Sequence, residues 1–199
     1  MPDGSVVWLN SETRLTYPEH FAGDRRWVDL EGEAYFEVAK DAEKPFIVQA
    51  GDIDVEVFGI SFNVNNYSYG EFVQTALLNG SVKISGKIVK EPVYLKPNEL
   101  FKYRKMDQSS SVEAVKAGLY ADWIKDRLVF DNACLSDILI SMKGRYNMDF
   151  ECPGQFAAST HLSFMIRQES IEEVMEAMRL IAPIKYKISG KKVCIIPKK

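Results

Sequence analysis

The clearest alternation in the chain is Ile53-Asp54-Val55-Glu56-Val57, in which apolar and acidic residues take turns. Side chains of a β-strand point alternately to the two faces of a sheet, so this pattern predicts a strand with one buried and one solvated face. The residues on either side of it contain further short strand-like runs. These are Val6–Leu9, Arg14–Tyr17, Trp27–Leu30, Ala34–Val38, Phe46–Val48, Phe62–Val64, Val73–Leu77 and Val82–Ile84.

Turn signals separate these runs, and they include Asp3-Gly4, Glu31-Gly32, Gly51-Asp52 and Asn79-Gly80. About ten strands at roughly ten-residue spacing, with no helical period, predict an all-β domain. We therefore expect residues 1–104 to form a β-sandwich, a barrel or a twisted, solenoid-like sheet. The fold class of the whole chain is mainly β, followed by a smaller α+β part.

A polar stretch follows the strands. Lys105–Ser111 ends in three serines and lacks the apolar spacing of a helix or a strand. Residues 105–122 are therefore predicted to be a linker.

Residues 123–199 are expected to form a small α+β domain. Arg127–Phe130 is strand-like, and an apolar stripe at helical spacing follows it. A second helix is predicted after Ser170, because Glu173 stands three residues later and the two can cap the free N–H groups reciprocally. The stripes are Leu135, Ile138, Leu139, Met142 and Tyr146 for the first helix, and Ile171, Val174, Met175, Met178 and Ile181 for the second.

Further strands complete this domain. Met148–Cys152 ends at a Pro-Gly turn, His161–Ile166 is a strand, and Ile184–Ile188 with Lys192–Ile196 predicts a hairpin. The expected order is β-α-β-β-α-β-β, with two helices on one face of a small sheet in a two-layer arrangement.

The composition and net charge of the chain argue against some classes of protein. The chain has 199 residues, 46% of them hydrophobic, and a formal net charge of −3. This is globular usage, and it argues against a protein that binds nucleic acid by neutralising phosphates. No apolar run approaches the roughly 18 residues of a membrane span. The opening Met1–Ser5 lacks signal-peptide features and is typical of a cut inside a longer protein.

Catalytic and metal chemistry has little support. His20 and His161 lie in different halves, and Cys134, Cys152 and Cys194 show no metal-ligand spacing. The carboxylates Glu31, Glu33, Glu37, Asp41 and Glu43 could suggest a glycosidase pair or a calcium site, but their spacing argues against both. Glu31, Glu33 and Glu37 are expected on the solvated face of a strand. No glycine-rich loop precedes a helix. We expect no catalytic, cofactor-binding or metal-binding residue, and hence no enzyme and no cofactor. A carbohydrate- or small-ligand-binding module stays as an alternative, because the chain holds Trp8, Trp27 and Trp123.

Seven short sequence motifs in the first half resemble those of the FecR family in order and spacing. They are Asp3–Ser11, Leu15–Pro18, Leu30–Val38, Lys44–Val48, Gly59–Val64, Leu78–Val82 and Leu95–Glu99. The second half is similar to the domain that follows in such proteins. The residues that carry this similarity are Trp123, Arg127–Asn132, Tyr146-Asn147 and the last hairpin. This domain also resembles the short N-terminal domain of secretins and TonB-dependent transporters.

Three features depart from the family pattern. Asn98 and Asp126 stand where glycine is common, and both residue types tolerate a left-handed backbone. The family has a strand before its Asp-Gly motif, whereas this sequence begins at Met1, directly before that motif. Without that strand, one edge of the first sheet is expected to be open.

The resemblance implies the periplasmic, signal-receiving region of a single-pass inner-membrane anti-sigma factor. Its implied partners are the signalling domain of an outer-membrane TonB-dependent transporter, for iron chelates or glycans, and an extracytoplasmic-function sigma factor that binds a cytoplasmic segment. No contact with nucleic acid is implied, and the membrane is reached only through a separate transmembrane helix. Proteolysis and sigma-factor release would regulate transcription. The residues that bind the transporter are unknown from the sequence, but an exposed strand edge is the expected mode of protein–protein interaction.

Overall fold

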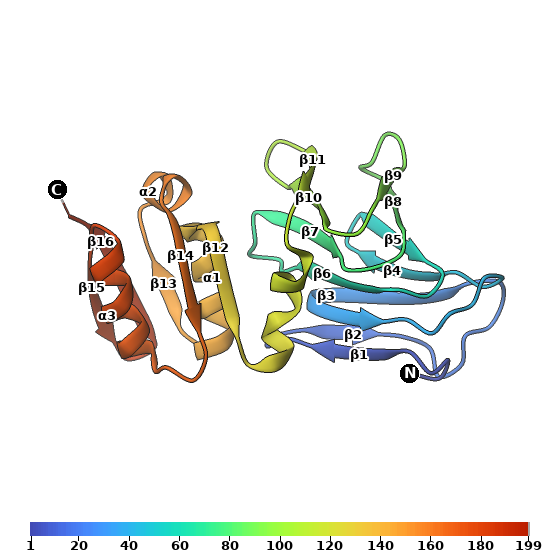
Figure 1. The fold of residues 1–199 in the computed structure, drawn as a ribbon, viewed down its shortest axis with the longest axis horizontal. Coiled ribbons are helices and arrows are strands. Elements are labelled where there is room, and N and C mark those ends of the chain that lie inside the picture. Colours follow the sequence, from blue (N-terminus) through green and yellow to red (C-terminus); the bar gives the residue numbers. More distant parts are fainter. Residues whose placement is uncertain (199) are drawn as a thin grey trace. The chain divides into compact units, whose positions relative to one another are not determined.

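The structure is a computed structural model that describes residues 1–198, and the chain divides into two compact units (Figure 1). The first unit is Met1–Ile124 and the second begins at Lys125. No helix within the described residues is both long enough and apolar enough to cross a membrane.

Unit 1 is a single sheet of eleven strands. Its order is β11-β10-β7-β6-β3-β4-β5-β8-β9, and both β1 and β2 pair with β3. The strands are β1 (Val6–Leu9), β2 (Arg14–Thr16), β3 (Arg26–Glu37), β4 (Phe46–Ala50), β5 (Ile53–Val57), β6 (Ser61–Asn66), β7 (Phe72–Leu77), β8 (Val82–Gly86), β9 (Val93–Leu95), β10 (Glu99–Arg104) and β11 (Ser109–Ala114). The predicted strand runs are thus confirmed, and β9, β10 and β11 are additional.

β3 joins the two halves of this sheet. Its first part pairs with β2 and β4, and its second part, from Gly32 onward, pairs with β6 and β1. Glu31-Gly32 was predicted to be a turn between two strands, and that prediction is wrong. The strand continues through Gly32, where Thr13 comes close to the backbone. Only glycine fits there, because its φ is 105° and a Cβ would lie 2.5 Å from Thr13 Oγ1.

The apolar faces of the two halves enclose the core of unit 1. Phe36 on β3 stacks on Phe62 at 5.0 Å between ring centroids and meets Phe46 of the other half edge-on at 6.1 Å. Ile53, Val55 and Val57 are fully buried in the same core, as their alternation predicts. The turn from β9 to β10 brings β9, one end of the strand order, near β10, the strand next to the other end, so the coiled sheet nearly closes.

The predicted linker at residues 105–122 is wrong. β11 pairs with β10 along six residues, and the 3₁₀ helix η1 (Ala117–Lys125) follows with Ala117 and Ala121 buried. Every residue of β11 is exposed. Backbone hydrogen bonds hold this strand, so its sequence carries no apolar pattern from which it could be recognised.

Unit 2 has eight elements: β12 (Leu128–Cys134), α1 (Leu135–Tyr146), β13 (Asp149–Glu151), α2 (Gly154–Ser159), β14 (His161–Ile166), α3 (Ile171–Ile181), β15 (Ile184–Ser189) and β16 (Lys192–Pro197). The two predicted helices, the Ser170/Glu173 capping box and the final hairpin are confirmed. α2 was not predicted. The strands form two sheets, β12-β14 and β13-β16-β15, instead of the single small sheet that we expected.

Positive φ values mark several turns. Asn98 (64°) and Asp126 (54°) have the left-handed backbone expected of them. Gly59 has a φ of 129°, and a Cβ there would lie 2.4 Å from Lys40 Cα. Only glycine fits at this point, where the chain enters β6.

Candidate functional site

Arg26 is the most deeply buried charged side chain of unit 1. It is the first residue of β3 and shares the parity of Val28 and Leu30, which belong to the core. Alternate residues of a strand point to the same face, so the guanidinium enters the interior, where 2% of the residue is exposed. A buried cation is costly unless it is paired and hydrogen-bonded.

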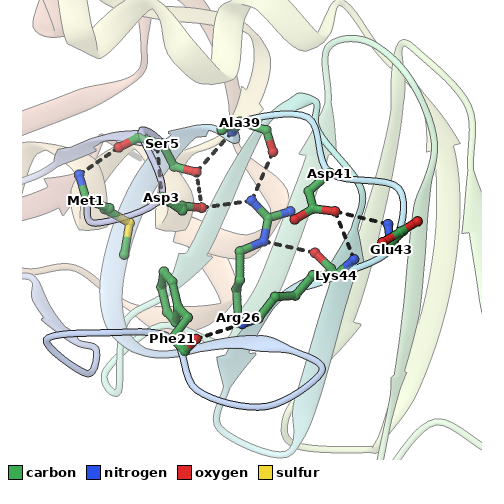
Figure 2. Close-up of polar contacts among 9 residues, drawn as sticks. All are labelled: Met1, Asp3, Ser5, Phe21, Arg26, Ala39, Asp41, Glu43 and Lys44. Atoms are coloured by element: carbon green, nitrogen blue, oxygen red, sulfur yellow. Dashed lines mark hydrogen bonds and ion pairs between the residues drawn. The ribbon is translucent and has the colours of Figure 1, made fainter.

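Three acceptors surround this guanidinium (Figure 2). Nη1 donates to Asp3 Oδ2 at 2.8 Å and to the Ala39 carbonyl at 2.9 Å, and Nε donates to the Lys44 carbonyl at 2.9 Å. The group also lies 5.5 Å from the centre of the Phe46 ring. Arg26 therefore joins the N-terminal turn, the loop after β3 and the core.

The N-terminal turn is itself tightly bonded. Asp3 accepts hydrogen bonds from the backbone N–H of Ser5 at 3.0 Å and from its hydroxyl at 2.7 Å, and Ser5 Oγ accepts from the Ala39 N–H. Burial alone would raise the pKa of Asp3, but the bonds from Ser5 and Arg26 outweigh it and hold the pKa below its usual value. Asp3 is therefore ionised at neutral pH.

One donor in this cluster stays open. Arg26 Nη2 is buried and has no hydrogen-bond partner among residues 1–198. Asp41 also lies in this cluster, and its Oδ1 accepts from the N–H groups of Glu43 and Lys44, which shapes the loop (Figure 2). The cluster is an anchor that fixes the start of the chain to β3.

A second polar cluster lies on the opposite face of β3. Asn10 Nδ2 donates to Glu33 Oε2 at 2.8 Å, and Asn63 Nδ2 donates to Glu33 Oε1 at 2.9 Å. Burial raises the pKa of Glu33, although the bonds from the asparagines oppose this. The predicted solvated face is confirmed for Glu31 and Glu37, which are exposed, and wrong for Glu33.

Asn63 extends this cluster to η1. Its Oδ1 accepts a hydrogen bond from Trp123 Nε1 at 3.1 Å. Tyr67 closes the other end, since its hydroxyl donates to the Ser11 carbonyl at 2.7 Å. These hydrogen bonds fix main-chain segments relative to one another, and through Trp123 they connect η1 to the cluster around Glu33.

The other residues that we considered do not converge. His20 and His161 are both exposed, in different units, and the three cysteines are free thiols. Cys134 is the N-cap residue of α1 and its Sγ lies 3.1 Å from the Ala157 carbonyl. No group of three or more His, Cys, Asp or Glu side chains within the described chain could hold a metal ion.

Each of the two units matches a known protein-family profile. The profile of the family described as "FecR protein" matches residues 1–83, and the profile described as "FecR, C-terminal" matches residues 127–195. The chain belongs to the FecR family. The FecR family is a family of signalling anti-sigma factors, and membership implies a sigma factor as the partner of the protein.

Two solved structures resemble this FecR chain along its whole length. Both are crystal structures of a candidate anti-sigma factor from Parabacteroides distasonis, at 1.65 and 2.50 Å resolution. The first has a TM-score of 0.92 and 28% identity, and covers 100% of this chain and 93% of the other. The second has a TM-score of 0.91 and 28% identity, with coverage of 100% and 92%. No curated protein matches the sequence.

The FecR fold leaves several strand edges open. In unit 1, β9 and β11 end the strand order, and β1 and β2 each pair only with β3. In unit 2, β15 is an edge of its sheet and carries Lys185 and Lys187 on its exposed side. Such edges can accept a strand of another protein.

One sequence signal could have revealed the Arg26 anchor, because Arg26 has the same parity as Val28 on a strand and is therefore expected on the buried face. No local sequence signal marked Asn63.

Proposed function

We propose that this chain is the periplasmic, signal-receiving region of a transmembrane FecR-type anti-sigma factor. In this proposal the signalling domain of an outer-membrane TonB-dependent transporter binds it when the transporter is loaded, for example with an iron chelate or a glycan. Proteolysis then releases an extracytoplasmic-function sigma factor from a cytoplasmic segment. The chain acts by binding and not by catalysis.

The observation that carries this proposal is the match to both FecR profiles, together with a candidate anti-sigma factor that aligns with all of this chain. The open strand edges of the two units support a docking role. An added strand gains main-chain hydrogen bonds from such an edge and selectivity from alternate side chains.

The test is calorimetric titration of the chain with the purified signalling domain of the TonB-dependent transporter encoded beside it. We expect saturable binding, and no heat from the signalling domain of an unrelated transporter. If both domains are folded and the cognate pair gives no binding, the transporter relay is wrong. The anti-sigma assignment would then require another signal.

A second candidate function rests on one row of the sheet. Trp27 and Tyr94 are 39% and 66% exposed, and strand register places them at the two ends of the row Trp27–Ile47–Glu56–Lys83–Tyr94. Glu56 and Lys83 form an ion pair at 3.6 Å between them. Ile47, between Trp27 and this ion pair, is 1% exposed, so the open part of the row is Tyr94 with the ion pair. An exposed aromatic ring beside polar groups suits a sugar. A saturable change in tryptophan fluorescence with oligosaccharides, lost in Trp27→Ala, would favour this function.

A further inference from the structure

β11 is unusual among the edge strands of unit 1. It has six residues, whereas β1 has four and β2 and β9 have three each. Its sequence, Ser109–Ala114, contains neither lysine nor proline, the residues that commonly protect an edge against strand addition. All six residues are exposed, including Val112 at 43%. β11 is therefore a long, open edge whose only charged residue is Glu113.

The hydrogen-bond pattern tells which backbone groups of β11 are free. The N–H of Val115 donates to the Asn98 carbonyl at 2.8 Å, and these residues lie opposite each other when the β10–β11 register is extended by one pair. In antiparallel pairs the bonding positions alternate, so Ser109, Ser111 and Glu113 bond to β10. The N–H and C=O groups of Ser110 and Val112 consequently point to the open side.

Cations line one face of this edge. Phe101 and Tyr103 of β10 point into the core, so Lys102 and Arg104 point outward. In the register of β10 with β11, Arg104 is opposite Ser109 and Lys102 is opposite Ser111. The serine side chains are short, so they leave room for both long cationic side chains to extend across β11 after a change of rotamer.

A shallow groove of about 170 Å³ lies at this place, lined by the two cations, Phe72 and β11. Lys102 Nζ and Arg104 Cζ lie 4.1 and 5.2 Å from the centre of the Phe72 ring on β7, so the charged ends rest beside β10 on the side away from β11. Both would swing across β11 to meet an added strand. Arg104 also pairs with Asp107 at 3.4 Å, but both side chains are half exposed, and such pairs contribute little. A partner carboxylate can replace Asp107.

Glu113 makes the other end of the groove negatively charged. It lies opposite Leu100, two positions from Ser111 and on the same face. An added strand would thus meet a cation, a cation and an anion at its alternate positions. The matching side chains are acidic, acidic and basic.

We propose that the open edge of β11 binds an extended segment of a partner protein that carries two acidic side chains and one basic side chain at alternate positions. The backbone of Ser110 and Val112 supplies the ladder hydrogen bonds, and Arg104, Lys102 and Glu113 supply the charge selection. The inference rests on the proposed function only in taking the transporter's signalling domain as the source of this segment.

The first test uses peptides and the whole chain. The probes are seven-residue peptides in which valine alternates with Glu, Glu and Lys, made in both orders, and charge-reversed peptides with Lys, Lys and Glu. We expect one of the acidic orders to bind, with chemical-shift changes at β11, and the reversed peptides to stay free. Equal binding of both charge patterns, or no binding of either acidic order, would overturn the proposal.

Two variants separate the edge from its charges. Val112→Pro removes an outward N–H, and binding should weaken by about tenfold, the equivalent of one net hydrogen bond. Ser111→Pro is the matched control, because it removes an N–H that bonds to β10 and should loosen β11 itself. Arg104→Glu keeps the backbone intact and reverses one of the three charges. The acidic peptide should then bind more weakly, and a peptide with Lys, Glu and Lys at the alternate positions should bind better. If the affinities of both peptides stay unchanged, the charge selection is wrong.

The signalling domain provides the last comparison. If it binds the wild-type chain and Val112→Pro equally well, β11 is not its docking edge, and the proposed function still stands. If it does not bind the wild-type chain, the transporter relay fails, and the peptide experiment alone decides whether β11 accepts a strand.

Discussion

The indole N–H of Trp123 donates a hydrogen bond to Asn63 Oδ1 across 3.1 Å and thereby ties η1 to β6 in the middle of the sheet. Asn63 can accept this bond because its amide nitrogen donates to the Glu33 carboxylate, which only accepts. The position of η1, whose last residue, Lys125, is the first residue of unit 2, thus depends on the Glu33 carboxylate on β3.

Replacing Trp123 by phenylalanine should loosen η1. The variant loses one hydrogen bond and leaves Asn63 Oδ1 short of a donor, so we expect unit 1 to lose about 1–2 kcal/mol of its free energy of unfolding. Urea unfolding followed by circular dichroism measures this. Trp27→Phe is the control, since Trp27 is 39% exposed on the opposite half-sheet, and its cost should be smaller. An equal cost for both variants would contradict this role of the indole.

Gly59→Ala should be among the most damaging small substitutions. The added methyl group meets Lys40 Cα at 2.4 Å while the backbone keeps a φ of 129°. Strain and overpacking together should cost about 3 kcal/mol or more. Gly23→Ala is the matched control, because Gly23 also has a positive φ, 75°, but no atom lies within 4 Å of the place that its methyl group would take. Thermal unfolding of the two variants separates crowding from backbone strain.

Asp3→Asn should weaken the Arg26 anchor. Removing one partner of a buried ion pair leaves the other charge uncompensated, so we expect a loss of about 3 kcal/mol at neutral pH. Glu31→Gln, which affects the exposed pair with Arg14, should cost less than about 1 kcal/mol. Similar losses in the two variants would argue against the anchor.

The pH dependence of the Asp3 contribution has a defined sign. The pKa of Asp3 is lower in the folded chain than in the unfolded chain. Its stabilisation is therefore complete above the unfolded pKa and disappears as the pH falls through the lower, folded pKa. Unfolding curves of the wild-type chain and Asp3→Asn should converge in acid, and a gap that widens there would contradict the ion pair.

Glu33 should act in the opposite direction. Its pKa is raised in the folded chain, so the unfolded chain releases this proton first as the pH rises. Its contribution to stability therefore falls between the unfolded pKa and the higher, folded pKa. Glu33→Gln should remove this decline, which urea titrations across mildly acidic pH can measure. An unchanged slope would show that the Glu33 carboxyl stays solvated.

Ser170→Ala should destabilise unit 2 and leave unit 1 unaffected. The Ser170 hydroxyl accepts from the Glu173 N–H at 3.2 Å, and Glu173 Oε2 accepts from the Ser170 N–H at 2.8 Å. Loss of this cap should cost about 1 kcal/mol. Ser189→Ala, at an exposed strand end, is the control. Hydrogen exchange of the α3 amides checks the prediction, and unchanged exchange would contradict it.

Strands and helices with apolar periods could be predicted from the sequence, because burial imposes those periods. Ile53–Val57 and the stripe of α3 are such cases. β11 and α2 escaped prediction for physical reasons. β11 is held by backbone bonds, and α2 is a six-residue helix that begins directly after Pro153, where a turn was the simpler interpretation.

The polar clusters were less accessible to sequence analysis. Glu33 has the parity of an outward-facing residue, and nothing in the sequence indicates that Trp123 of η1 bonds to the Asn63 partner of Glu33, because residues 105–122 were predicted to be a linker. Arg26 was marked only by its parity with Val28 and Leu30. Partners such as Asn63 become visible only when strands distant in the sequence lie side by side.

The continuity of β3 has a consequence for how this chain can vary in length. Its two parts pair with different neighbours, and the side chains of both parts alternate between core and exterior. One inserted or deleted residue would reverse the facing of every residue on one side of the change. Either the Arg26 anchor or the Glu33 cluster would then turn the wrong way. We therefore expect natural length differences to occur in loops such as residues 17–25, and β3 to keep its twelve residues.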